Sequence, residues 1–214
     1  FDTQIIDLQE SQKKLLDELI RISEKISVNR KEKSKIFENG IEILLNELGI
    51  PKGKFEIQFN KSEKFLATGT DKIEFLFSSN SGINPQPLSK IASGGEISRL
   101  MLSIKTILSE KVQLPTIIFD EIDAGISGEI AHKMGLIMQQ LARNMQIISI
   151  THLPQIASKG NEQFIVEKRL INNKTITSIK KLNQQERINE IARLLSGSEI
   201  TDASIENAKV LLNS

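Results

Sequence analysis

The residues best suited to chemistry follow two short apolar runs. Asp120 and Glu121 come directly after the run at 116–119, and His152 closely follows the run at 147–150. Both runs are typical of strands covered on both faces, and the helical spacing between them predicts a parallel pair whose carboxyl ends share one edge. Open α/β sheets bind ligands at this edge. One carboxylate could hold Mg²⁺ while its neighbour deprotonates an attacking water, and the histidine could bind a phosphate oxygen or hold the water. An acid at the end of a strand can also simply cap the next helix, which needs no special function.

A second pattern lies at the start of a helical repeat. Ser93 and Glu96 have the spacing of a capping box, which needs no special function. Gly94 and Gly95 stand between them, where each lowers helix stability by roughly 1 kcal/mol relative to Ala. A helix end without side chains lets an anion approach its N–H groups closely. Both interpretations hold together, and the glycines favour the anion.

The first part of the chain predicts long helices. A heptad series of apolar residues, broken by Gln12, indicates a coiled-coil strand or, equally well, one helix of a bundle. Its members are Ile5, Leu8, Leu15, Leu19, Ile22 and Ile26. The stripe needs a partner helix in either case. Residues 29–33 are polar, so we expect a break there and a second helix from Ser34 that ends at Gly49.

The remainder predicts an α/β fold. Residues 55–59 and 73–77 alternate between apolar and polar, which indicates two paired strands around a loop at 61–71. Turn-forming residues at 80–87 predict a surface loop. Further along we expect helices at 97–108 and 128–144, a hairpin of strands 164–167 and 175–179, and closing helices at 185–195 and 202–212.

Composition excludes several classes of function. The chain has no cysteine and only two histidines, which removes disulfides, thiol catalysis and iron-sulfur clusters. A net charge of +1 provides no overall field toward nucleic acid. No apolar run reaches the roughly 18 residues of a membrane helix, so we expect a cytosolic protein without a membrane partner. The first residue is Phe1, which suggests a piece of something longer.

Three segments together resemble the ABC-type ATPase heads. Residues 88–99, 116–127 and 150–158 are similar to the signature, the Walker B segment with its D-loop, and the switch histidine, in the same order. The amino-acid sequences of these segments are most similar to those of the SMC-like ATPases of bacterial DNA repair. The resemblance covers nearly the whole chain and implies a coiled-coil arm at 1–33 and a C-terminal head lobe at 34–214, an α/β lobe with a parallel sheet core, flanking helices and a β-hairpin. Ala92 departs from the Leu of transporters.

The resemblance also implies roles for individual residues. Asp120 would hold Mg²⁺, Glu121 would be the general base, and His152 would contact the γ-phosphate of ATP. The signature residues Ser93, Gly94, Gly95 and Glu96 would face the nucleotide of a second head, and Asp123 would help couple the two heads. Glu96 replaces the Gln of transporters, as is common among SMC-like heads.

The implied function is ATP-driven repair of DNA double-strand breaks and recombination. Two heads of a homodimer would engage around ATP and Mg²⁺, with DNA as partner and the nucleoid as location. The chain lacks the P-loop that such heads need, and the resemblance places it in an N-terminal lobe. Residues 49–55 look like a P-loop, but the segment is one residue too short for that motif. It ends at Phe55 where the motif needs a Ser or Thr hydroxyl, and it precedes a strand pattern instead of a helix. The chain alone is therefore expected to be inactive.

Other interpretations stay open. A transporter nucleotide-binding domain would carry the same motifs but no long coil before the signature. A coiled-coil dimerisation module would need no catalysis. Basic residues could contact DNA phosphates, although a solvated surface is the favoured reading. They are Lys52, Lys54, Lys168, Arg169, Lys174, Lys180 and Lys181. His132 matches no motif and is interpreted as a helix-surface residue.

Overall fold

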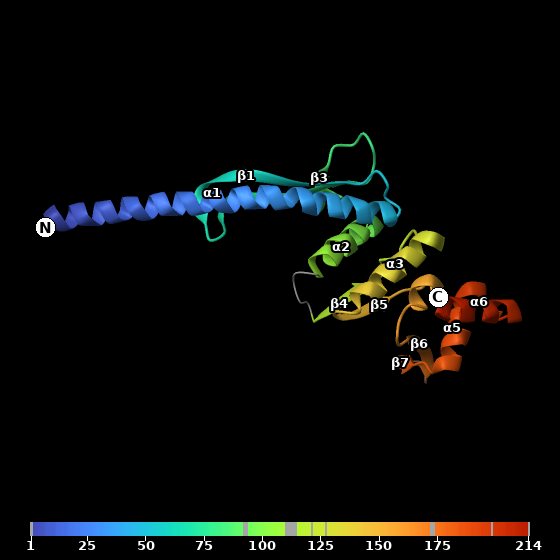
Figure 1. The fold of residues 1–214 in the computed structure, drawn as a ribbon. Coiled ribbons are helices and arrows are strands. Elements are labelled where there is room, and N and C mark those ends of the chain that lie inside the picture. Colours follow the sequence, from blue (N-terminus) through green and yellow to red (C-terminus); the bar gives the residue numbers. More distant parts are fainter. Residues whose placement is uncertain are drawn as a thin grey trace. The chain divides into compact units, whose positions relative to one another are not determined.

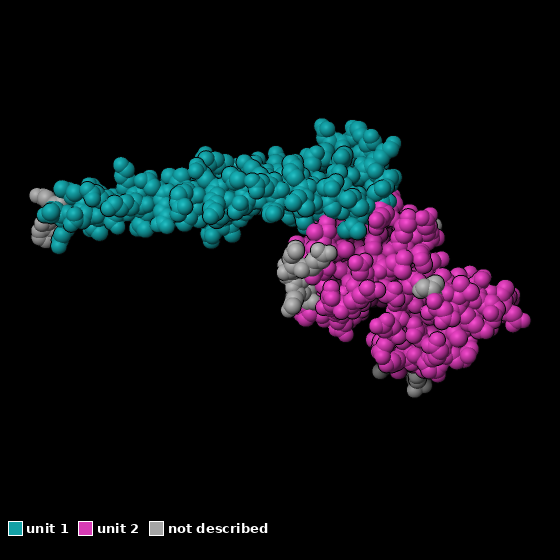
Figure 2. All heavy atoms as spheres, in the orientation of Figure 1, with its two compact units in different colours: residues 1–46, 50–92 teal, residues 47–49, 93–214 magenta. Residues whose placement is uncertain are grey.

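The structure is a computed structural model that describes residues 2–91, 94–109, 115–120, 122–126, 128–171, 174–197 and 199–213. The chain divides into two compact units, residues 1–46 with 50–92, and residues 47–49 with 93–214 (Figure 2). Each unit is described by itself.

One long helix, α1 (Asp2–Glu47), forms the N-terminal part of the first unit (Figure 1). The expected break at 29–33 is wrong, because the Arg, Lys and Glu residues of that stretch favour helix even without an apolar stripe. The predicted stop is confirmed. Gly49 adopts φ +79°, and the N–H of Ile50 donates to the carbonyl of Leu45 at 2.8 Å.

An antiparallel sheet in the order β1-β2-β3 accompanies this helix. Its strands are β1 (Lys54–Leu66), β2 (Gly69–Ser78) and β3 (Gln86–Pro87). The two predicted strands and their pairing are confirmed, with Ile57 opposite Phe75. The loop expected at 61–71 is instead mostly strand, with a tight turn at its tip. Residues 49–55 lead through a turn into β1, which begins at Lys54, and this agrees with rejecting a P-loop there.

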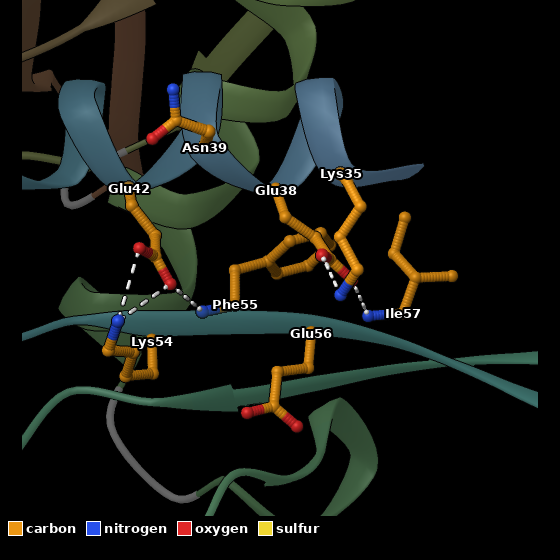
Figure 3. A pocket seen from close by; sticks show the side chains of 8 residues that line it. All are labelled: Lys35, Glu38, Asn39, Glu42, Lys54, Phe55, Glu56 and Ile57. Atoms are coloured by element: carbon orange, nitrogen blue, oxygen red, sulfur yellow. Dashed lines mark hydrogen bonds and ion pairs between the residues drawn. The ribbon is translucent and has the colours of Figure 1, made fainter. Parts of the chain in front are cut away.

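Aromatic packing and two carboxylates join β1 to α1. Phe55 is buried. The centroid of its ring lies 6.2 Å from that of Phe37 and 5.5 Å from that of Phe75. On the free edge of β1, Glu38 accepts from the N–H of Ile57 at 2.7 Å, and Glu42 accepts from the N–H of Phe55 at 3.5 Å (Figure 3). These contacts satisfy backbone donors that the sheet leaves open. The shallow pocket between α1 and β1 is thus a structural seam with its own polar partners.

Asp71 of β2 contacts α1 further toward its N-terminus. This buried carboxylate accepts from the hydroxyl of Ser27 at 2.9 Å and from the guanidinium of Arg30 at 3.0 Å. On the N-terminal side of these contacts, the heptad residues Ile5, Leu8, Leu15, Leu19 and Ile22 are exposed. Within the part of the chain that the structure describes, nothing covers this stripe.

The second unit alternates helices and strands. Its first elements are α2 (Gly94–Ser109), β4 (Thr116–Asp120), α3 (Gly128–Leu141), β5 (Gln146–Ile150) and α4 (Pro154–Ala157). The predicted parallel pair is confirmed, with Ile118 opposite Ile148. The predicted helices are confirmed as well, and Met134, Met138 and Leu141 of α3 are buried.

One face of this parallel pair is bare. Ile118, Ile148 and Ile150 are 64%, 43% and 52% exposed, whereas Phe119 on the opposite face is buried. The expectation that both faces are covered is wrong for the described residues. Parallel sheets are normally covered on both sides, so these isoleucines lack the layer that such a sheet requires.

A hairpin and two helices follow. The hairpin joins β6 (Phe164–Ile171) to β7 (Lys174–Lys181), as predicted, and residues 172 and 173 between the strands lie outside the described residues. Helices α5 (Gln184–Ser196) and α6 (Asp202–Asn213) pack through Ile191, Ala192 and Ala208, which confirms the two closing helices.

A capping box starts α5 and allows a direct test of local stability. Asn183 accepts from the N–H of Glu186 at 2.9 Å, and Glu186 accepts from the N–H of Asn183 at 2.9 Å. We expect Asn183→Ala to lower the free energy of unfolding by about 1 kcal/mol, because a helix donor loses its partner. Urea unfolding measures this change. Asn207→Ala, on the exposed surface of α6, is the matched control, and an equal loss in both variants would contradict the role of the cap.

Candidate functional site

The register of the parallel pair brings the predicted site residues to one edge. Asp120 is the last residue of β4 and lies opposite Ile150, the last residue of β5. The next residues, Thr151 and His152, therefore leave the sheet where Asp120 does. Asp120 is exposed, and the side chain of His152 is 68% exposed. The predicted shared edge is confirmed, while Glu121 lies outside the described residues.

Asp123 lies behind this edge, in the turn after β4. Its side chain is only 1% exposed, and its Oδ2 accepts a hydrogen bond from the hydroxyl of Thr151. The same hydroxyl accepts from the N–H of Leu153 at 3.0 Å. The Nδ1 atom of His152 lies 3.7 Å from Oδ1 of Asp123. The resemblance to ABC-type heads implied a role for Asp123 toward a second head, which stays a prediction. The sequence did not predict this internal network.

The two glycines at the start of α2, the tip of this helix, have different surroundings. Gly94 is exposed, and a Cβ added there would meet nothing within 4 Å. A Cβ on Gly95 would lie 2.8 Å from the carbonyl oxygen of Ala124, so this glycine allows the tip to touch the turn after β4. Packing therefore explains why a glycine stands at position 95, and the sequence did not predict this explanation. Glu96 lies in the first turn as predicted, and Ser93 is outside the described residues.

Arg99 is a further charged residue near this tip that the sequence analysis did not single out. Partial burial lowers the pKa of its guanidinium, an effect that the nearby carboxylate of Glu96 opposes. Its Nε atom is buried and has no hydrogen-bond partner in the described part of the protein. The signal available in the sequence was its place one helical turn after Gly95, on the same side of α2.

A short helix that the sequence analysis did not predict fixes the chain after His152. Pro154 opens α4, a position where its missing N–H costs nothing. A Cβ on Gly135 of α3 would lie 3.0 Å from the carbonyl oxygen of Gln155. Gly135 therefore lets α3 and α4 approach closely, and the segment that carries His152 is attached to the core at this point.

The site fits a magnesium ion that is bound mainly through its substrate. No group of three or more His, Asp or Glu side chains converges on one point among the described residues. Mg²⁺ in phosphate-binding enzymes uses one or two carboxylates together with phosphates and water. The exposed carboxylate of Asp120 at the sheet edge suits this arrangement, and it offers the hard oxygen ligand that this ion prefers.

Three of the basic residues considered for DNA contact form ion pairs. Lys54 contacts Glu42 at 3.3 Å, and Lys180 and Lys181 form ion pairs with Glu186 and Glu162. These pairs agree with the favoured reading of a solvated surface. The side chains of Arg169 and Lys174 are outside the described residues. His132, which matches no motif, is half-buried on α3.

No helix among the described residues is long and apolar enough to cross a membrane.

Comparison with known proteins identifies the family. No family model matches the chain. It is 38% identical to the DNA repair protein RecN of Haemophilus influenzae over 99% of its own length and 39% of that protein. It is 40% identical to RecN of Rickettsia bellii over 96% of its own length and 38% of that protein. The chain belongs to the RecN family. It spans about two fifths of the length of these RecN proteins.

Comparison with a solved structure shows which fold this member of the RecN family has. The head domain of Smc from Pyrococcus yayanosii, solved with a coiled coil and joint, superposes with a TM-score of 0.55 at 18% identity. The superposition covers 92% of this chain and 37% of that structure. It confirms the predicted fold class, an SMC-type head lobe, for this member of the RecN family.

Proposed function

We propose that the chain is the C-terminal part of a RecN-type ATPase that uses ATP binding and hydrolysis in the repair of DNA double-strand breaks and in recombination. The observation that carries the proposal is the register of β4 and β5, which brings Asp120 and His152 to one sheet edge. The match to the DNA repair protein RecN supports the process, and the SMC-type fold supports the nucleotide chemistry.

Each residue at the edge has a defined role in this proposal. Asp120 holds Mg²⁺, which when bound would neutralise charge on the transferred phosphate. Glu121 accepts a proton from the attacking water, and His152 contacts the terminal phosphate. The exposure of Asp120 and His152 supports these roles, since both must reach a ligand from outside the lobe.

The tip of α2 acts on a different nucleotide. Two heads of a homodimer would enclose two ATP molecules, and Ser93, Gly94, Gly95 and Glu96 would face the nucleotide held by the partner. The open space at Gly94 supports this role, because a phosphate can approach the helix end there. Asp123 would help to couple the two heads.

The uncovered surfaces of the chain fit a longer protein. The exposed heptad stripe of α1 suits an antiparallel partner helix, so residues 1–33 would be the returning arm and residues 34–214 the head lobe. The bare isoleucines of β4 and β5 suit the missing lobe that carries the P-loop. Such a protein would act in the cytoplasm, at the nucleoid, with DNA as its partner.

The 214-residue chain alone is expected to show no ATP hydrolysis above background and no tight ATP binding. Catalysis of phosphoryl transfer depends on positioning and neutralising the triphosphate, and the P-loop that does so is not in this sequence. Steady-state phosphate release and calorimetric titration with ATP and Mg²⁺ measure both properties. Phosphate release that disappears on replacing Glu121 by Gln would contradict this expectation. Activity that returns when the chain is co-expressed with a P-loop lobe would support it.

A further inference from the structure

The turn after β4 and the segment after β5 are joined by a short hydrogen-bond network. Thr151 donates its hydroxyl proton to Oδ2 of Asp123 and accepts from the N–H of Leu153. These contacts define the position of one carboxylate oxygen and leave the other, Oδ1, available.

Oδ1 of Asp123 is buried without a hydrogen-bond partner in the described part of the protein. Leaving a buried carboxylate oxygen unpaired is costly, and groups of this kind call for an explanation. The nitrogen Nδ1 of His152 is 3.7 Å away, and the imidazole is otherwise largely exposed. A small rotation of this exposed ring would bring an Nδ1–H group into hydrogen-bond distance of the orphaned oxygen.

We propose that Asp123 is a positioning residue for His152. Its carboxylate holds the proton of the neutral imidazole on Nδ1 and turns the Nε2 side of the ring outward, where a ligand can reach it. Which nitrogen of a histidine faces a ligand is set by the hydrogen bond that the other nitrogen makes. The inference rests on the proposed function only for the identity of the ligand, a terminal phosphate.

The carboxylate is placed firmly enough to do this. The carbonyl of Ala124, the next residue, lies against the tip of α2, where a Cβ on Gly95 would be 2.8 Å from it. On the other side, α4 is held against α3 by the close approach at Gly135. Both segments that carry the pair are therefore attached to helices of the same unit.

Nitrogen NMR of the 214-residue chain labelled with ¹⁵N-histidine tests the proposal. The chain has two histidines, so His152→Gln assigns the signals. At a pH where the ring is neutral, we expect the Nδ1–H tautomer to predominate for His152. In Asp123→Ala the population should reverse to the Nε2–H tautomer that unrestrained histidines favour. His132 should not change and serves as the internal control.

Two further variants separate positioning from general loss of structure. Asp123→Asn keeps the shape of the side chain, and the Thr151 hydroxyl directs its carbonyl inward, so the amide group faces His152 and should also favour Nε2–H. Thr151→Ser retains the hydroxyl and should keep the Nδ1–H tautomer. A mainly Nε2–H tautomer in the unaltered chain would overturn the proposal, as would identical tautomers in the unaltered and Asp123→Ala chains. Because no nucleotide is present, neither result bears on the proposed ATPase function.

Discussion

Replacing Glu121 by Gln is expected to lower the ATP turnover number by about 10²- to 10⁴-fold, the usual contribution of a general base. The experiment uses a protein that joins this chain to a lobe with a P-loop. Gln keeps the size of the side chain but cannot accept the proton of the attacking water. Binding of ATP should persist, so the variant should accumulate as engaged pairs of heads. Phosphate release and size-exclusion chromatography with ATP measure the two effects.

Glu129→Gln is the matched control for this experiment. Glu129 is an exposed carboxylate on α3 that pairs with Lys133 at 2.8 Å, and this contact lowers the pKa of Glu129. Its replacement should leave turnover unchanged. Undiminished turnover in Glu121→Gln would remove the assignment of the general base, and equal losses in both variants would indicate a nonspecific effect.

Replacing Gly94 by Asp is expected to weaken ATP-dependent pairing of heads strongly while leaving the fold intact. The added carboxylate has open space around it and stands at the start of α2, where a negative charge stabilises a helix by about 0.3–1 kcal/mol. The same charge would face the phosphates of the partner's nucleotide. Like charges across an interface cost several kcal/mol, so we expect engagement to weaken at least about 100-fold.

Gly94→Ala and Gly95→Ala make the interpretation specific. Gly94→Ala adds bulk without charge and should weaken engagement less than Gly94→Asp. Gly95→Ala should instead lower the thermal stability of the chain, because its Cβ would meet the carbonyl of Ala124. Sedimentation with ATP and thermal unfolding separate these effects. Normal engagement in a folded Gly94→Asp protein would show that the tip of α2 does not face a nucleotide.

Periodicity predicted most of the elements correctly. The alternation at 55–59 and 73–77, and the helical repeats of α2 and α3, depend on burying one face, and this burial also decides the structure. The prediction of a break in α1 was wrong because it relied on burial alone. The polar stretch at 29–33 remains helical through intrinsic propensity.

The sequence predicted which site residues share an edge but not how they are held. Parallel pairing follows from the strand-helix-strand pattern, so Asp120 and His152 could be placed together in advance. The close approaches at Gly95 and Gly135 depend on backbone that is distant in sequence, and no local pattern reveals them. The burial of Asp123 was equally hidden, since an aspartate in a turn is usually exposed.

The contact between Gly95 and Ala124 joins two sites that would serve different nucleotides. In an engaged pair, the tip of α2 would sense the ATP of the opposite subunit, whereas His152 would act on the ATP of its own. Asp123 lies beside His152, and the next residue, Ala124, lies against Gly95, so a displacement at one site would reach the other through two consecutive residues. Such a short route would give the dimer a built-in way to make hydrolysis in one subunit depend on the occupancy of both.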